Sequence, residues 1–103
     1  MKMLTKEIEN KIPALYAQDG KGENATVYVK FFNPCGAATW YGTEYDPIER
    51  IFFGWATLDG QFGELGYFSL TELENITLPY GLKIERDLHF KPCTIKEVKE
   101  NHL

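Results

Sequence analysis

The segment 38–46, "ATWYGTEYD", places one indole, two phenols and two carboxylates within nine residues. Its carboxylates, Glu44 and Asp46, are two residues apart, which is about 7 Å along an extended strand. Two carboxylates at that separation can act as general acid and general base when apolar surroundings keep one of them protonated. The alternative is a solvated strand face, or an ion pair with Arg50 or Arg86, and we favour this structural interpretation.

Two further groups of reactive residue types fall short of a catalytic or metal-binding pattern. His89 shares one face of a predicted strand with Glu85 and Asp87, whereas a metal centre needs at least three ligands that converge in space. Cys35 has no histidine close to it in the sequence, and Lys30 is its one basic neighbour. The sequence therefore predicts no catalytic residue, no metal site and no cofactor, and it favours a protein that is not an enzyme.

Glycines punctuate the segment "GQFGELGYFSL" at positions 60, 63 and 66. A phosphate-binding loop places such glycines before a helix N-terminus, with a basic residue nearby. Here they lead into a predicted strand, and the nearest charges are Asp59 and Glu64. We therefore interpret the glycines as a tight turn with close packing against a neighbouring strand.

Aromatic residues interleaved with lysine raise a third possibility, the stacking of single-stranded nucleic acid. A sheet face with Tyr28, Lys30 and Phe32 beside Trp40 would resemble such a platform. The net charge of −4 and the scattered basic residues disfavour contacts to phosphates.

Length and composition predict one domain, spanning residues 1–103, because 103 residues support a single hydrophobic core. No apolar stretch approaches the roughly 20 residues of a membrane span. The opening "MKMLTKEIEN" is charged from the start, so no signal peptide is expected. We therefore expect a cytoplasmic protein, without membrane contact, in which Cys35 and Cys93 stay reduced.

The hydrophobic pattern predicts an α+β fold with an antiparallel meander of four or five strands. Short helices are expected at the N-terminus, where Leu4, Ile8 and Ile12 recur before Pro13, after the fourth strand and at the C-terminus. The helices are expected to pack largely on one face of the sheet. The predicted strands are 26–32, the two arms of a hairpin over 39–58, then 64–69 and 82–90, and the predicted later helices are 70–75 and the segment after Thr94.

Alternation along these strands also predicts the interior and one ion pair. Arg86 alternates with Leu and Ile, so we expect it to pair with a carboxylate of the hairpin, Glu44 being the first choice. Trp40 and Glu44 are expected on the same face. The predicted interior consists of Val27, Val29, Phe31, Tyr41, Phe53, Trp55, Leu65, Tyr67, Leu73, Ile84 and Leu88.

In chain order the segments "LTKEIENKIPALYA", "VKFFNP", "TWYGTEYD", "FFG", "ELGYFSL" and "LPYGLKIERDLHFKP" form a distinctive series between Leu4 and Pro92. This series resembles a family of uncharacterised bacterial domains that occurs largely on plasmids, integrative elements and phages. The resemblance implies an accessory role in mobile-element biology and supplies no catalytic residue. It directs attention to these motif positions as binding residues: Trp40, Tyr41, Glu44, Asp46, Glu64, Gly66, Tyr67, Arg86 and Asp87.

The leading hypothesis is a small non-enzymatic accessory protein that binds another protein of the mobile element or of its host. Aromatic residues make up 15% of the chain, and exposed Tyr and Trp are typical anchors of protein interfaces. The predicted patch is the hairpin edge around Trp40, Glu44, Asp46 and the 47–50 turn. Two alternatives stay open: a single-stranded nucleic-acid-binding module that uses an aromatic sheet face, and a small hydrolase-like enzyme that uses Glu44 and Asp46.

Overall fold

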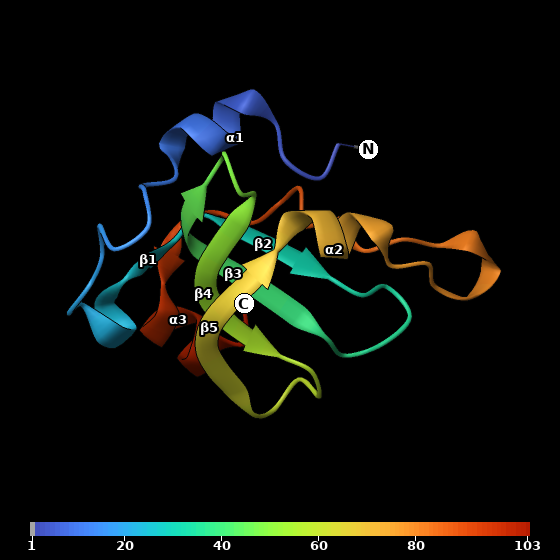
Figure 1. Cartoon of the computed structure of the whole chain (residues 1–103). Helices are drawn as coiled ribbons and strands as arrows, with labels where there is room; N and C mark the ends of the chain where they lie inside the picture. The colour runs from blue at the N-terminus through green and yellow to red at the C-terminus, as the bar shows by residue number, and fades with distance from the viewer. Residues whose placement is uncertain (1) are drawn as a thin grey trace.

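An antiparallel sheet of five strands forms the centre of the fold, with strand order β5-β4-β3-β2-β6. Figure 1 shows β5, β4, β3 and β2 side by side. The computed structural model describes residues 2–103. The five strands are β2 (Val29–Phe32), β3 (Thr39–Asp46), β4 (Ile51–Thr57), β5 (Gly63–Ser69) and β6 (Glu85–Arg86). Two short strands, β1 (Thr26–Val27) and β7 (Cys93–Thr94), pair with each other in a second sheet. The predicted α+β class and the antiparallel meander are confirmed.

Three short α-helices begin at residues whose side chains cap them. They are α1 (Lys6–Lys11), α2 (Leu70–Asn75) and α3 (Ile95–Asn101). Thr5 caps α1, Ser69 accepts a hydrogen bond from the Glu72 backbone at the start of α2, and Thr94 forms a complete capping box at the start of α3. Single 3₁₀ turns, η1 (Gly22–Asn24) and η2 (Pro79–Gly81), lie within the connecting segments.

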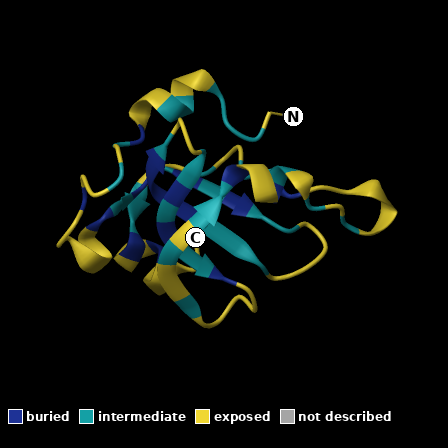
Figure 2. Cartoon of the chain, viewed as in Figure 1, coloured by how far each residue is buried: buried dark blue, intermediate teal, exposed yellow. Residues whose placement is uncertain are grey.

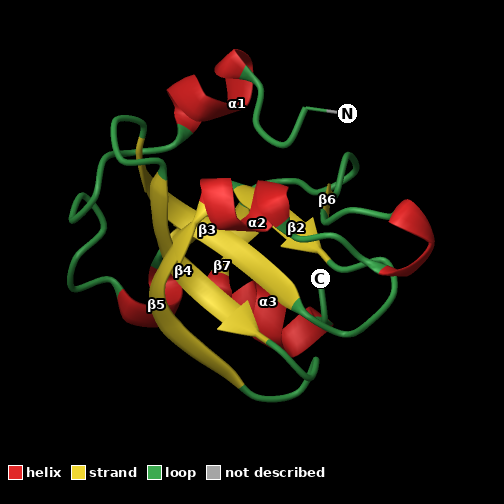
Figure 3. Cartoon of the chain, turned by 45° about the vertical axis from the view of Figure 1, so that its right-hand side comes forward, coloured by secondary structure: helices red, strands yellow, loops and turns green. Residues whose placement is uncertain are grey.

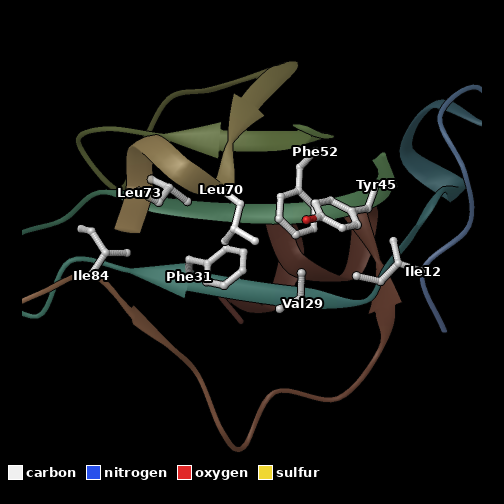
Figure 4. Close-up of a cluster of buried hydrophobic side chains, with 8 residues drawn as sticks. All are labelled: Ile12, Val29, Phe31, Tyr45, Phe52, Leu70, Leu73 and Ile84. Atoms are coloured by element: carbon white, nitrogen blue, oxygen red, sulfur yellow. The ribbon is translucent and has the colours of Figure 1, made fainter. Parts of the chain in front are cut away.

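The larger hydrophobic cluster lies on the face of the sheet that α2 covers (Figure 4). Leu70 and Leu73 of α2 pack with Phe31 and Phe52, and α1 closes one end of the cluster through Ile8. Its buried members are Ile12, Val29, Phe31, Tyr45, Phe52, Leu70, Leu73 and Ile84. The Phe52 ring contacts the rings of Phe31, Tyr45 and Phe68 on this face, so a row of aromatic side chains joins β2, β3, β4 and β5.

A second cluster lies on the opposite face, beneath α3. Ile95 and Val98 of α3 pack with Val27 and Tyr41, and Trp55 lies at the margin of this cluster. Figure 3 shows α2 and α3 on opposite sides of the sheet. The expectation that the helices pack largely on one face agrees with α1 and α2 but is wrong for α3, because α3 has its own apolar stripe and buries it against Tyr41.

A β-bulge in β3 changes which side chains share a face. The register between β3 and β4 shifts between Gly42 and Glu44, so Thr43 is the extra residue. Before the bulge Gly42 pairs with Gly54, and after it Glu44 pairs with Phe53, the neighbour of Gly54 in β4. Because directly paired residues share a face, Trp40 points to the α2 side and Glu44 to the α3 side. The prediction that these two residues share a face is wrong for this reason.

The strand predicted over residues 26–32 is divided at Tyr28. Its first part, β1, belongs to the small sheet and its second part, β2, to the large one. Val27 consequently lies in the α3-side cluster, whereas Val29 and Phe31 lie in the α2-side cluster. All three are buried, as predicted, although they do not belong to one face.

Other predictions of burial fail at the ends of the sheet. Leu65 and Tyr67 of β5 are 51% and 57% exposed, and Leu88 is 62% exposed because the strand predicted over 82–90 extends only over Glu85–Arg86. Phe53 and Trp55 are only partly buried. The buried apolar residues that the prediction omitted are Ile12, Ala25, Tyr45, Phe52, Leu70, Ile95 and Val98.

Candidate interaction surface

Strand β5 is one edge of the large sheet, and it pairs on one side only, with β4. It spans seven residues, whereas β6, at the other edge, spans two. Natural proteins usually protect long edge strands with charges, prolines, bulges or a covering segment. β5 has one charged residue and no proline, and its register with β4 is continuous from Gly63 to Ser69. It is therefore a long and unprotected edge.

The ladder between β4 and β5 fixes which backbone groups point outward. The Leu70 N–H donates a hydrogen bond to the Arg50 carbonyl at 2.9 Å, just beyond the end of the strand. Bonded and non-bonded pairs alternate along an antiparallel ladder. Leu70 occupies a hydrogen-bonded position, and Leu65 and Tyr67 are separated from it by an odd number of residues along the chain. They therefore occupy the non-bonded positions, where the N–H and C=O groups point away from β4. Within residues 2–103 these groups have no backbone partner.

Large apolar side chains surround these free backbone groups. Leu65 and Tyr67 lie on the α3 side of β5, and Phe62 (80% exposed) and Leu58 (76% exposed) extend from the hairpin that joins β4 to β5. Figure 2 shows much of β5 and this hairpin as exposed. A hollow of about 680 Å³ runs along the strand, lined by Leu58, Phe62, Leu65, Tyr67 and Phe68 among others. We call β5 together with Leu58 and Phe62 the β5 edge surface.

Glu44 lies behind this surface and holds a loop in place. Its side chain is buried, and its Oε1 and Oε2 accept hydrogen bonds from the backbone N–H groups of Tyr16 and Gln18 at 2.8 and 2.7 Å. The loop continues to the sheet because the Gln18 side-chain amide donates to the carbonyl oxygens of Thr26 and Thr43. Both carboxylate oxygens of Glu44 are therefore engaged in hydrogen bonds that hold this loop.

The loop held by Glu44 brings a second tyrosine to the edge. Tyr16 is 64% exposed. Hydrogen bonding with the Tyr16 phenol, followed by burial and by the charges of Tyr16, Asp19 and Glu44, raises the pKa of Tyr67 above its ordinary value. Asp19 and Glu44 thus place negative charge near the Tyr67 phenol.

The remaining hairpin residues do not form the predicted patch. Trp40 is partly buried against the α2-side cluster. Tyr41 is buried, its hydroxyl donates to the Leu103 carbonyl at 2.7 Å, and burial raises its pKa to about 12. Asp46 accepts a hydrogen bond from the Ile48 backbone and so closes the turn. Both strands of this hairpin lie inside the sheet, so the hairpin has no free edge.

Arg86 and Asp87 lie at the opposite side of the sheet from β5. Arg86 Nη1 donates to the Lys2 carbonyl at 2.7 Å, and Asp87 forms an ion pair with Lys30 at 3.7 Å. The predicted ion pair between Arg86 and Glu44 is wrong, because β6 pairs with β2 and is separated by it from β3. The nine motif positions predicted to bind therefore scatter, and among them only Glu64, Gly66 and Tyr67 belong to the β5 edge surface.

The geometry also bears on the two alternative functions. Asp46 is not among the residues that line the hollow beside Glu44, so this hollow holds only one of the two carboxylates. Lys30 pairs with Tyr41 across β2 and β3, whereas Trp40 pairs with Phe31 on the other face. The platform of Lys30 beside Trp40 that base stacking would need is thus not assembled.

Metal-ligand geometry and membrane spans are absent from the described part of the chain. Residues 2–103 hold no group of three or more His, Cys, Asp or Glu side chains that could bind a metal ion, and His89 with Glu85 and Asp87 forms no such group. Cys35 and Cys93 are both free thiols. Among the same residues, the helices are all too short or too polar to cross a bilayer.

Sequence reasoning missed most of the β5 edge surface. Leu65 and Tyr67 alternate in the pattern of a half-buried strand, and that pattern is the same for a central strand and an edge strand. Phe62 and Leu58 lie in a glycine-containing turn, where large apolar residues are unusual on a solvated hairpin. That excess of apolar residues in a turn is the signal that could have identified the surface.

Comparison with protein families and structures gives one match. Neither the curated proteins nor the solved structures contain a match to this chain. A family model described as "Protein of unknown function (DUF2958)" matches residues 3–97, which include every strand, α1, α2 and the first turn of α3. The chain therefore belongs to the family described as Protein of unknown function (DUF2958).

Proposed function

We propose that this protein is a non-enzymatic interaction module that binds another protein at the β5 edge surface. The observation that carries the proposal is the pair of outward-facing backbone positions, Leu65 and Tyr67, on a seven-residue edge strand. An extended segment of a partner can add to such an edge as a further strand, with main-chain hydrogen bonds providing affinity.

The side chains favour the same use of the surface. Leu65, Tyr67, Phe62 and Leu58 are all more than half exposed. Exposed apolar residues that gather beside one free strand are typical of interaction surfaces, whereas single exposed apolar residues are ordinary. Tyrosine is also enriched among the residues that dominate binding energy at interfaces.

The resemblance of the chain to domains of plasmids, integrative elements and phages favours a partner that the element or its host encodes. A role as accessory protein agrees with the engagement of Glu44 and Asp46 in structural hydrogen bonds. The proposed surface differs from the hairpin patch that the sequence predicted.

Capture of partners by Leu65 variants tests the proposal. Leu65→Pro removes the outward N–H and leaves the ladder to β4 intact, since prolines are tolerated on the solvent side of an edge strand. Leu65→Ala keeps the N–H and removes most of the side chain, and Tyr80→Ala is a control at a residue that is 98% exposed in η2.

A protein recovered by the wild type is then purified, and its affinity for each variant is measured by calorimetry. We expect Leu65→Pro to abolish binding, Leu65→Ala to weaken it and Tyr80→Ala to leave it unchanged. Equal affinity of the partner for the wild type and for Leu65→Pro, with both proteins folded by circular dichroism, would refute the proposal.

A further inference from the structure

The β5 edge surface carries a negative charge that no ion pair among residues 2–103 neutralises. Glu64 is the one charged residue of β5. It is exposed and forms none of the ion pairs found among residues 2–103. Its carboxylate is therefore available to a partner.

Two hollows share Leu65, and the charged residues that line them are all acidic. The hollow along β5 includes Asp59 and Glu64, and the hollow on the α3 side, about 350 Å³ in volume, includes Asp19 and Glu44. Asp59 accepts hydrogen bonds from the neutral N–H groups of the hairpin backbone, which leave its charge in place. No lysine, arginine or histidine lines either hollow.

Two lysines of the α3 side, Lys99 and Lys30, are already engaged. Lys99 forms an ion pair with Glu23 at 3.2 Å, and its ammonium group lies 5.5 Å from the centre of the Trp55 ring. Lys30 is paired with Asp87. These contacts reduce what either lysine can offer to Glu64 or Asp59, so the field along β5 stays negative.

On the basis of the proposed edge-strand function, we infer that the segment that adds to β5 is basic and apolar in alternation. Directly paired residues share a face, so the partner residue opposite Glu64 lies on the α2 side, and those opposite Leu65 and Tyr67 lie on the α3 side. In the direction of β5 the partner pattern is basic, apolar, any residue, apolar. The basic residue pairs with Glu64, and the apolar residues extend the patch of Leu65 and Tyr67.

A second copy of this chain fits that pattern less well than a basic segment does. β5 contains no lysine or arginine, so a β5 strand from another copy cannot place a cation opposite Glu64. The net charge of −4 on each copy adds repulsion. A basic extended segment of a different protein is therefore the occupant that the charges favour.

Selection from a random peptide library displayed on phage tests the inference with the full chain. The wild type, Glu64→Lys and Leu65→Pro serve as targets. We expect peptides selected on the wild type to contain a Lys or Arg beside an apolar residue and to lose binding to Leu65→Pro. Glu64→Lys, which changes one exposed side chain and keeps the strand, should select Asp or Glu at the same position.

A synthetic copy of a selected peptide gives the quantitative readout. Its dissociation constant should rise by about threefold for Glu64→Gln at low ionic strength, as expected for an exposed ion pair, and the difference should shrink as salt is added. Leu65→Ala serves as the control for side-chain loss without loss of the backbone donor.

Each negative result of these experiments leads to a different conclusion. Peptides that need the Leu65 N–H but show no preference for Lys or Arg, or no change of preference with Glu64→Lys, overturn the inference and leave the proposed function standing. Peptides that bind Leu65→Pro as well as the wild type, or a selection that yields no peptide dependent on β5, contradict both. Dimers in sedimentation that Leu65→Pro dissociates would make a second copy the occupant and overturn the inference.

Discussion

Replacement of Glu44 by glutamine is expected to destabilise the protein, although the side chain keeps its size. Glu44 is 3% exposed, and its two carboxylate oxygens accept the Tyr16 and Gln18 N–H groups at 2.8 and 2.7 Å. A hydrogen bond to a charged group contributes about 1.5–3 kcal/mol to stability. Glutamine retains one acceptor oxygen and turns an NH₂ group toward the other donor, so one charge-assisted bond is lost and one buried N–H is left unsatisfied.

The expected loss for Glu44→Gln is about 2–4 kcal/mol, and for Glu44→Ala, which removes both bonds, about 3–6 kcal/mol. Total stabilities of domains lie at about 5–15 kcal/mol, so the glutamine variant is the one that should stay folded. The assay is urea denaturation followed by tryptophan fluorescence, with Glu49→Gln as control at an exposed carboxylate of the same hairpin. The control should change stability by less than about 0.5 kcal/mol.

Hydrogen exchange gives this prediction a local readout. The Tyr16 and Gln18 amides should exchange slowly in the wild type and much faster in Glu44→Gln. A loss of stability below about 0.5 kcal/mol together with unchanged protection of both amides would refute the account of Glu44 as the anchor of this loop.

Three further predictions concern the sheet and two ionisable groups. Gly54→Ala should lower the free energy of unfolding by about 3 kcal/mol or more, because a Cβ there would lie 1.8 Å from the Tyr41 carbonyl oxygen. Gly66→Ala, at the paired position with open space, should raise it by about 0.5–1 kcal/mol, and urea denaturation compares the two variants. Absorbance titration should show one tyrosine that ionises near pH 12, and this step should be absent in Tyr41→Phe. Because the pKa of Tyr41 is higher in the folded state than in the unfolded state, the stability linked to its neutral phenol is complete below about pH 10 and is lost as pH rises through 12. Hydrogen bonding to Arg50 lowers the pKa of Glu74, so Glu74→Gln should lower the melting temperature at pH 7, and this difference should fade as pH drops below about 4.3.

Local signals in the sequence predict most of the elements. Alternation and the Asp-Pro turn predict the hairpin that β3 and β4 form, and the capping residues Ser69 and Thr94 mark the starts of α2 and α3. These signals depend on residues close together in the chain, and the structure agrees with them nearly to the residue.

Features that depend on distant parts of the chain are harder to predict. The bulge at Thr43 changes the face of Glu44, and its one local signal is the preceding Gly42, because an isolated glycine in a strand often marks a bulge without showing how the register shifts. The division of one predicted strand at Tyr28 likewise follows from the pairing of β1 with β7, near the end of the chain.

The candidate surface depends on strand order, which alternation does not contain. Tyr67 and Glu64 were predicted as binding residues from the motif they share, yet Tyr67 was also placed in the interior. The position of β5 at the edge of the sheet decides between these predictions, because no strand of the part of the chain that the structure describes covers its outer side. The predicted ion pair between Arg86 and Glu44 fails for the same reason, because alternation does not show that β2 lies between β6 and β3.

The most direct test of the central claim is amide hydrogen exchange at Leu65 and Tyr67 with and without a bound partner, either the captured protein or a selected peptide. If the partner adds as a strand to β5, these two outward amides become hydrogen bonded, and their exchange should slow by at least about tenfold at saturation. The amides of Glu85 and Arg86, at the opposite edge, should keep their rates. A saturated complex in which Leu65 and Tyr67 exchange at the free rate would contradict the claim that this protein binds through the β5 edge.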